Sequence, residues 1–99
     1  MSTENTSTAE HLALACLAQI EVNLKDNIQK GYEYISKAVS LKSDIALLVL
    51  YGEIAIKAKR YKDLLTLSEG ISNGRIQMYR AKCFVELGEL EKAKAILSD

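Results

Sequence analysis

The side chains that could do chemistry are few and scattered in this chain of 99 residues. Its one histidine, His11, has no second histidine or cysteine at metal-ligand spacing, whereas zinc sites take three or four ligands. Carboxylates such as Glu86, Glu89 and Glu91 fall on polar helix faces, where solvated side chains are normal. The chain has no phosphate-binding glycine loop and no serine-hydrolase or zinc-protease motif. We therefore expect no enzyme activity, no metal and no cofactor.

The two cysteines, Cys16 and Cys83, are too few for a disulfide framework. Each lies in a helical pattern of apolar residues, which predicts reduced thiols buried as small hydrophobic side chains. The longest apolar run, residues 45–51, is far shorter than the roughly 20 residues that span a bilayer. The N-terminus lacks the basic and apolar regions of a signal peptide. We expect a cytoplasmic location.

Charge and composition limit the classes of partner. Thirteen basic residues balance thirteen acidic ones, and 48% of the residues are hydrophobic. A neutral chain lacks the basic excess that binds nucleic acid or anionic membranes, and this chain is too apolar to be disordered. One basic cluster, Lys57, Lys59, Arg60 and Lys62 around Tyr61, could bind an acidic peptide or a phosphate, or could be solvated cations near a helix C-terminus.

Six helices are expected to position these side chains, giving an all-α domain over residues 9–97 behind a flexible tail at residues 1–8. A capping-box pattern from Ser7 to Glu10 marks the first helix start. Ser43 is expected to cap the third helix, and Gly88 to end the fifth. The expected helices are 9–23, 28–40, 44–59, 61–70, 74–87 and 89–97. In the first, a packing stripe is predicted at Leu12, Ala15, Cys16, Gln19 and Ile20.

Two of these hairpins share a pattern. Leu48, Tyr51-Gly52 and Ala55 precede Tyr61, just as Gln77, Arg80-Ala81 and Phe84 precede Leu90. The small residues Gly52 and Ala81 are expected to let the second helix of each hairpin approach the first. The segment Ala81–Leu97, with Phe84 three positions after a small residue and a Leu87-Gly88 turn, resembles the tetratricopeptide repeat.

The resemblance implies a right-handed solenoid of three antiparallel helical hairpins, with repeats at about residues 9–42, 43–72 and 73–97. Leu90 follows Tyr61 by 29 residues rather than the family's 34, so the middle repeat must be short. The family's function implies a non-catalytic protein–protein interaction module. In the family register, the residues lining its concave groove are Ala46, Val49, Leu50, Glu53, Ile56, Arg75, Met78, Tyr79, Lys82 and Val85.

The groove would bind a protein or peptide partner, or another domain of the same protein, by burying apolar surface. Because the C-terminal half is also similar to the terminal repeats of larger bacterial tetratricopeptide-repeat proteins, the alternative is a structural or oligomerising tail of a larger, possibly carbohydrate-active, protein. The third helix is apolar around almost its whole circumference, and such helices are normally covered. The first helix could cover it, a partner could bind there, or it could form a homodimer seam or meet an upstream domain.

Overall fold

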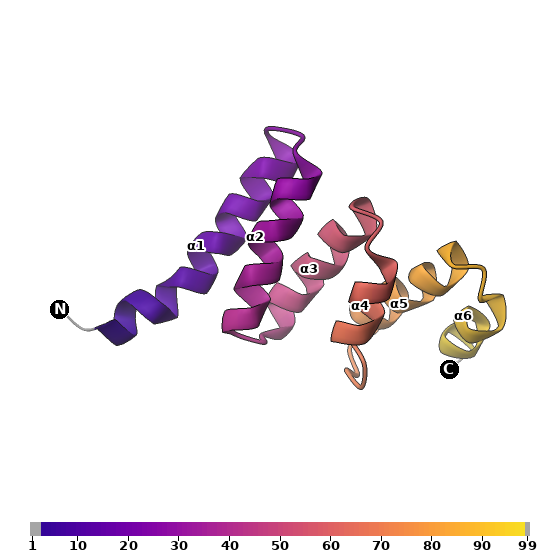
Figure 1. Ribbon diagram of the computed structural model, residues 1–99. Helices are drawn as coiled ribbons and strands as arrows, with labels where there is room; N and C mark the ends of the chain where they lie inside the picture. Colours follow the sequence, from indigo (N-terminus) through magenta and orange to yellow (C-terminus); the bar gives the residue numbers. More distant parts are fainter. Residues whose placement is uncertain (1–2, 99) are drawn as a thin grey trace.

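The computed structural model describes residues 3–98, and helices are the only regular secondary structure among them (Figure 1). The predicted all-helical class and six helices are thus confirmed over this range. The helices are α1 (Thr3–Asn23), α2 (Ile28–Leu41), α3 (Ile45–Lys57), α4 (Tyr61–Leu67), α5 (Gly74–Glu86) and α6 (Leu90–Leu97).

Three helix starts differ from the expected ones, and that of α6 differs by a single residue. α1 begins at Thr3 rather than at residue 9, so residues 3–8 extend this helix, and residues 1–2 of the expected tail lie outside the described residues. Extension of a helix that has already formed fixes few additional dihedral angles per hydrogen bond. α3 begins after Asp44, whose carboxylate accepts a hydrogen bond from the Ala46 amide at 2.8 Å. Asp44 is therefore the cap in place of Ser43. Gly88 has the expected positive φ of 80°.

α1 packs on α2 through a stripe rotated from the expected one. The buried residues of this stripe are His11, Ala15, Ala18 and Val22. Of the predicted stripe only Ala15 is buried, while Leu12, Cys16, Gln19 and Ile20 are exposed. The close approach requires Gly31 of α2, because a Cβ there would collide with the side chain of Val22 and lie 3.1 Å from the Ala18 carbonyl oxygen.

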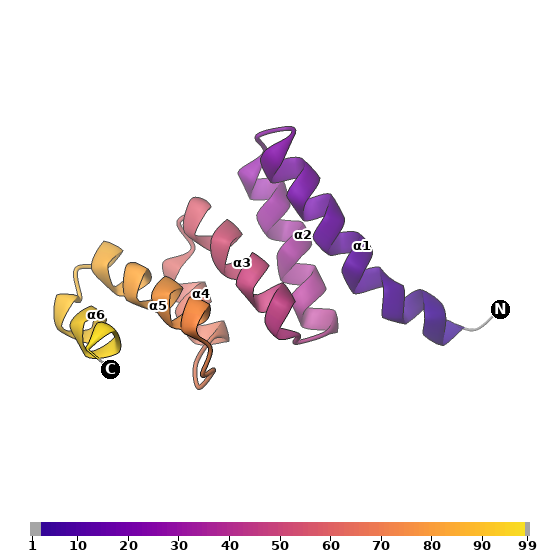
Figure 2. The same ribbon diagram turned by 180° about the vertical axis from the view of Figure 1, so that it is seen from behind.

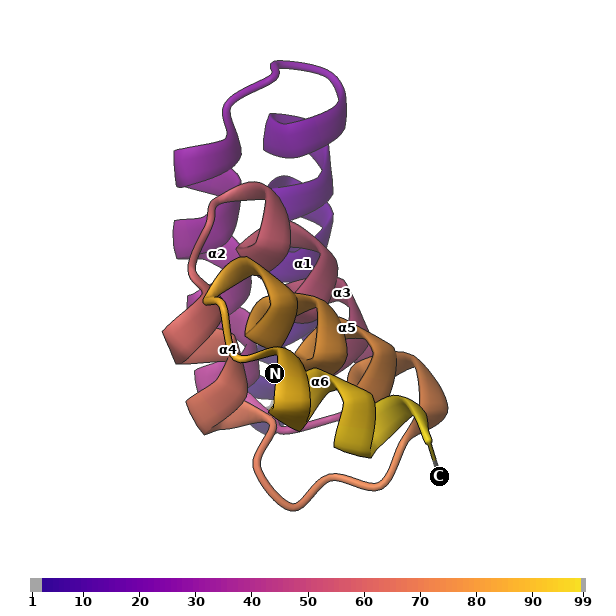
Figure 3. The ribbon, with the colours of Figure 1, turned by 90° about the vertical axis from the view of Figure 1, so that its right-hand side faces the viewer.

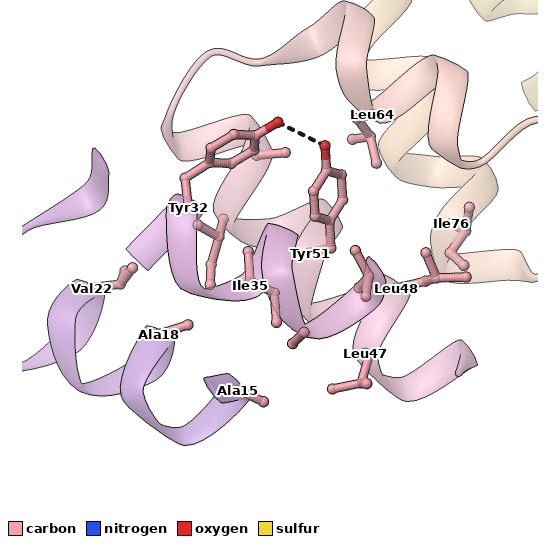
Figure 4. Close-up of a cluster of buried hydrophobic side chains, with 14 of the residues drawn as sticks. Ala15, Ala18, Val22, Tyr32, Ile35, Leu47, Leu48, Tyr51, Leu64 and Ile76 are labelled. Carbon is pink, nitrogen blue, oxygen red and sulfur yellow. Dashed lines mark hydrogen bonds between the residues drawn. The ribbon is translucent and has the colours of Figure 1, made fainter. Parts of the chain in front are cut away.

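α3 occupies the centre of the molecule and contacts α1, α2, α4 and α5. Figure 4 shows Leu47, Leu48 and Tyr51 of this helix between side chains of its neighbours. Gly52, Ile54 and Ala55 are buried as well. The apolar circumference is therefore covered largely by four helices of the same chain, of which α1 is one.

α3 and α5 meet where Tyr79 lies over Gly52. A Cβ placed on Gly52 would lie 2.5 Å from the Cδ2 atom of the Tyr79 ring. The small residue at this position was expected to accommodate the second helix of its own hairpin, α4. Gly52 instead accommodates the Tyr79 ring of α5, which occupies the space that a side chain at position 52 would need.

Side chains of α5 satisfy carbonyl groups at the end of the short helix α4 and in the loop after it. Arg80 donates from Nη1 to the Leu65 carbonyl and to the Ser68 hydroxyl, both at 2.8 Å. Gln77 donates from Nε2 to the Ile71 carbonyl at 2.7 Å. The last carbonyls of a helix have no partner within the helix, so these bonds fix α4 against α5.

The helices form an elongated stack with extents of 52 × 28 × 16 Å (Figure 2). Viewed along its length, α1, α3 and α5 follow one side, and α2 and α4 follow the other (Figure 3). Close backbone approaches join α1 to α3 and α3 to α5. Among the described residues α2 and α4 do not approach each other in this way, and a side-chain hydrogen bond from Tyr32 to Asp63 connects them instead. The stack is thus more closely packed along the odd-numbered helices than between α2 and α4.

We expect Gly52→Leu to lower the free energy of unfolding by about 1–3 kcal/mol, because the added side chain must displace the Tyr79 ring. Urea unfolding measures this loss. Gly52→Ala and Gly74→Ala form a matched pair, since no atom lies within 4 Å of a Cβ on Gly74. A Gly52→Ala variant as stable as Gly74→Ala would contradict the packing of Tyr79 on Gly52.

Candidate binding surfaces

The first candidate surface is formed by ten residues of α3 and α5 that the sequence predicts to line a groove, here called the odd-helix face. Every one of them is at least partly exposed. Val49, Leu50, Ile56 and Tyr79 are half-buried. The exposed members are Ala46, Glu53, Arg75, Met78, Lys82 and Val85, with Met78 at 66% and Val85 at 47% exposure.

α1 contributes one wall to this face. A pocket of about 200 Å³ lies between α1 and α3, and Leu50 and Glu53 of the odd-helix face line it. Gln19, Val22 and Asn23 line it from α1. The structure therefore brings two of the predicted residues together with residues of α1, while Tyr79 on Gly52 joins the α3 and α5 parts.

The odd-helix face carries charges of opposite sign on its two helices. Glu53 is exposed on α3, and Arg75 and Lys82 are exposed on α5. Apolar side chains lie on the same two helices, with Val49 and Ile56 on α3 and Met78 and Val85 on α5. A ligand that buried these apolar groups would meet an acidic group on one helix and two basic groups on the other.

A second candidate surface, missed by the sequence analysis, is a cavity of about 510 Å³ where α2 and α4 diverge over α3. We call it the tyrosine cavity. Tyr32 and Tyr51 pack with ring centroids 5.6 Å apart and an interplanar angle of 45°. Their hydroxyl oxygens are 2.8 Å apart, as the dashed line in Figure 4 shows. The remaining lining residues are Ser36, Val39, Ser40, Asp63, Thr66 and Leu67.

The hydroxyls of the tyrosine cavity form a directed chain of hydrogen bonds. Tyr32 donates its one proton to Oδ2 of Asp63 at 3.2 Å, so the bond between the two phenols is donated by Tyr51. Burial raises the pKa of Tyr51 above its ordinary value, and the hydrogen bond with Tyr32 raises it further. Tyr51 is therefore a protonated donor in the physiological pH range.

No short-range pattern in the sequence signals this cavity. Tyr32 and Tyr51 are 19 residues apart and Asp63 lies 31 residues after Tyr32. Their types and spacing are ordinary for helix positions that pack against a neighbour. These groups line one cavity because α2 and α4, which both pack on α3, diverge and leave a space between them.

The basic cluster is partly used within the fold. Arg60 lies over the ring of Tyr32, with Cζ 5.1 Å from the ring centroid, and its Nη1 atom is 3.6 Å from Oδ2 of Asp63. Lys59 forms the turn with a positive φ of 61°. A pocket of about 260 Å³ includes Lys59, Arg60 and Lys62 in its lining. The exposed guanidinium of Arg60 thus contacts two residues that line the tyrosine cavity, Tyr32 and Asp63.

The remaining candidate side chains are His11 and the two cysteines. His11 is buried at 5% exposure, and lies well inside α1 because that helix begins at Thr3. Both cysteines are free thiols, but Cys16 is exposed, so the expectation that it is buried is wrong. It faces away from α2. Within residues 10–98, whose side chains the structure describes, no group of three or more His, Cys, Asp or Glu side chains is arranged to hold a metal ion.

None of the helices in the described part of the chain has the length and apolar character needed to cross a membrane. The chain matches no family model, no curated protein and no solved structure.

Tyr32→Phe is expected to destabilise the protein more than Tyr51→Phe. The first change leaves the buried Tyr51 hydroxyl without its acceptor, at a cost of about 1–3 kcal/mol, whereas the second leaves Tyr32 bonded to Asp63 and costs about 0.5–1.5 kcal/mol. Urea unfolding compares them. The double variant should be more stable than Tyr32→Phe alone, because no hydroxyl is then stranded. The opposite ranking of the single variants would contradict the assigned donor direction.

Thiol titration is expected to distinguish the two cysteines. Burial raises the pKa of Cys83 to about 11, and the side chain has 0% exposure. In dilute protein at about pH 8, a disulfide reagent should therefore modify the exposed Cys16 rapidly and Cys83 only after unfolding, since the thiolate is the reactive form. Cys16→Ser should remove the fast phase. Rapid modification of both thiols in the folded wild type would show that Cys83 is accessible.

Proposed function

We propose that this chain is a non-catalytic interaction module whose odd-helix face binds a protein or peptide segment. The observation that carries the proposal is the accessibility of all ten residues on two helices in contact, α3 and α5. Seven of the ten are apolar and at least partly exposed, and accessible apolar residues that gather on adjacent elements are typical of interaction sites. The partner class includes another domain of the same protein.

The contact pattern supports a tetratricopeptide-like solenoid as the scaffold of this face. Each helix contacts the next in sequence, and contacts also join α1 to α3 and α3 to α5. In the proposed scaffold the first helices of successive hairpins line the inner side. The hairpins are then α1–α2, α3–α4 and α5–α6, and the short α4 accounts for the short middle repeat.

Side-chain chemistry indicates the kind of segment that this face suits. Val49, Ile56 and Met78 offer apolar surface whose burial favours binding, at about 25 cal/mol per Å² before the costs of association. Arg75 and Lys82 on α5 favour an acidic group on the same side of the ligand. The proposed ligand is an apolar segment with a carboxylate positioned over α5.

A displayed library of random peptides selected against the immobilised chain tests this proposal. We expect retained peptides to be rich in apolar and acidic residues. Met78→Lys is expected to weaken their binding by about tenfold, because it introduces a cation into the apolar contact. Leu97→Lys on α6 is the matched control, since Leu97 and Met78 are 67% and 66% exposed.

The control variant should change the affinity by less than about twofold and, like Met78→Lys, should leave the free energy of unfolding nearly unchanged. Two results would contradict the proposal. One is the absence of any peptide retained above the background of the library on a blocked support. The other is an equal loss of binding in Met78→Lys and Leu97→Lys.

A further inference from the structure

The side of α1 that faces away from α2 carries a cluster of exposed apolar side chains, here called the α1 outer face, beside the exposed amides Gln19 and Asn23. Its large side chains are exposed, with Leu12 at 56%, Leu17 at 40%, Ile20 at 39% and Leu24 at 80%. Ala13 and Cys16 complete it, and both are exposed. None of these six residues belongs to the odd-helix face.

The α1 outer face carries no charge. Between Glu10 and Lys25 the only Asp, Glu, Lys or Arg residue is Glu21. Glu21 is buried at 8% exposure, and its Oε2 atom lies 3.4 Å from Nζ of Lys25. Singly exposed leucines need no explanation, but an apolar patch without charged neighbours is typical of a surface that another element covers.

The opposite end of the stack differs in this respect. α6 exposes Leu90 and Leu97, yet it also carries charged pairs along its surface. The Nζ atom of Lys92 lies 2.9 Å from Oε1 of Glu89, and Nζ of Lys94 lies 3.8 Å from Oε1 of Glu91. A polar outer face of this kind suits a terminal helix of a stack in water, and the α1 outer face lacks it.

We propose that the α1 outer face is the seam of a homodimer in which two copies of α1 pack antiparallel, with the two-fold axis crossing the exposed side of the helix at the level of residue 18. Four of its residues are spaced symmetrically about that position: Leu12 and Leu24 lie six residues away on either side, and Cys16 and Ile20 lie two. The same symmetry places Leu17 and Ala13 opposite the uncharged amides Gln19 and Asn23. A two-fold axis needs a self-complementary surface. Here Leu12 of each copy meets Leu24 of the other, and Cys16 meets Ile20.

Shape and charge both favour a second copy as the occupant. A shallow hollow of about 370 Å³ on α1 is lined by Cys16, Gln19, Ile20, Asn23 and Leu24, and the proposed register places the second copy's residues around Cys16 and Leu17 over it. The uncharged seam sets no like charges opposite each other. The antiparallel arrangement also places the opposite ends of the two helix dipoles side by side.

The area that the seam buries limits the stability of the dimer. The segment from Leu12 to Leu24 extends about 18–20 Å at 1.5 Å per residue, and one helix face of this length buries less than the about 800 Å² that each partner of a stable dimer contributes. The dimer is therefore a weak one that dissociates on dilution.

Sedimentation equilibrium of the full chain over a concentration series tests the proposal. The wild-type average mass should rise from 11.0 kDa toward twice that value as the concentration increases. Ile20→Lys and the highly exposed Leu24→Lys should each raise the dissociation constant by about tenfold or more, and the matched control Leu97→Lys should not change it. A wild-type mass of one chain throughout, or equal weakening by Leu97→Lys, would overturn the proposal.

Oxidative crosslinking with diamide tests the antiparallel register. In Ile20→Cys, the native Cys16 of one copy should form a disulfide with the thiol at position 20 of the other, giving a covalent dimer. The wild type should crosslink poorly, because its two Cys16 residues are separated by about 6 Å along the helix axes in addition to the spacing between the helices. Efficient crosslinking of the wild type through Cys16, with none gained by Ile20→Cys, would indicate a parallel seam and overturn the proposed register.

Discussion

The need to remove α3 from water is the constraint on which the rest of the fold depends. Its thirteen residues include two charged side chains, Glu53 and Lys57, so no broad polar face is available for solvent. Covering a large aliphatic side chain is worth about 1.5–3 kcal/mol. Four helices meet this need by packing around α3, and the elongated stack is the consequence.

The two sides of the stack differ because α3 is covered differently on each. On the odd-helix side, Gly52 lets the Tyr79 ring lie directly on the helix backbone and joins α3 to α5. On the other side α2 and α4 diverge, and Tyr32 and Tyr51 line the space between them. The first arrangement gives a continuous surface with mixed charges. The second gives a cavity with a fixed chain of hydroxyl groups.

Periodicity and turn residues predicted the helices well, because these signals are local. The segment beginning at Ile28 and the glycine at position 88 illustrate this success. The rotation of α1 was not predictable in the same way: its alanines, together with leucines and isoleucine around the circumference, define no single stripe. Contact with Gly31 of α2 selects the face with Ala18 and Val22, which leaves Ile20 in solvent.

The candidate surfaces show the same division between local and distant information. Positions such as Met78 and Val49 follow from the helical register once a repeat pattern is assumed, and both are accessible in the structure. The tyrosine cavity depends on Asp63, which lies 31 residues from Tyr32, and on the angle between two helices. The spacing of residues in a single sequence does not predict that angle.

A continuous odd-helix face requires the contact between α3 and α5. Nuclear Overhauser spectroscopy of the isolated chain measures this contact directly. The structure predicts strong cross-peaks between the Tyr79 ring protons and the Gly52 α-protons, at dilution as well as at high concentration. Their absence, with a Tyr79 ring in solvent, would separate α5 from α3 and contradict the account.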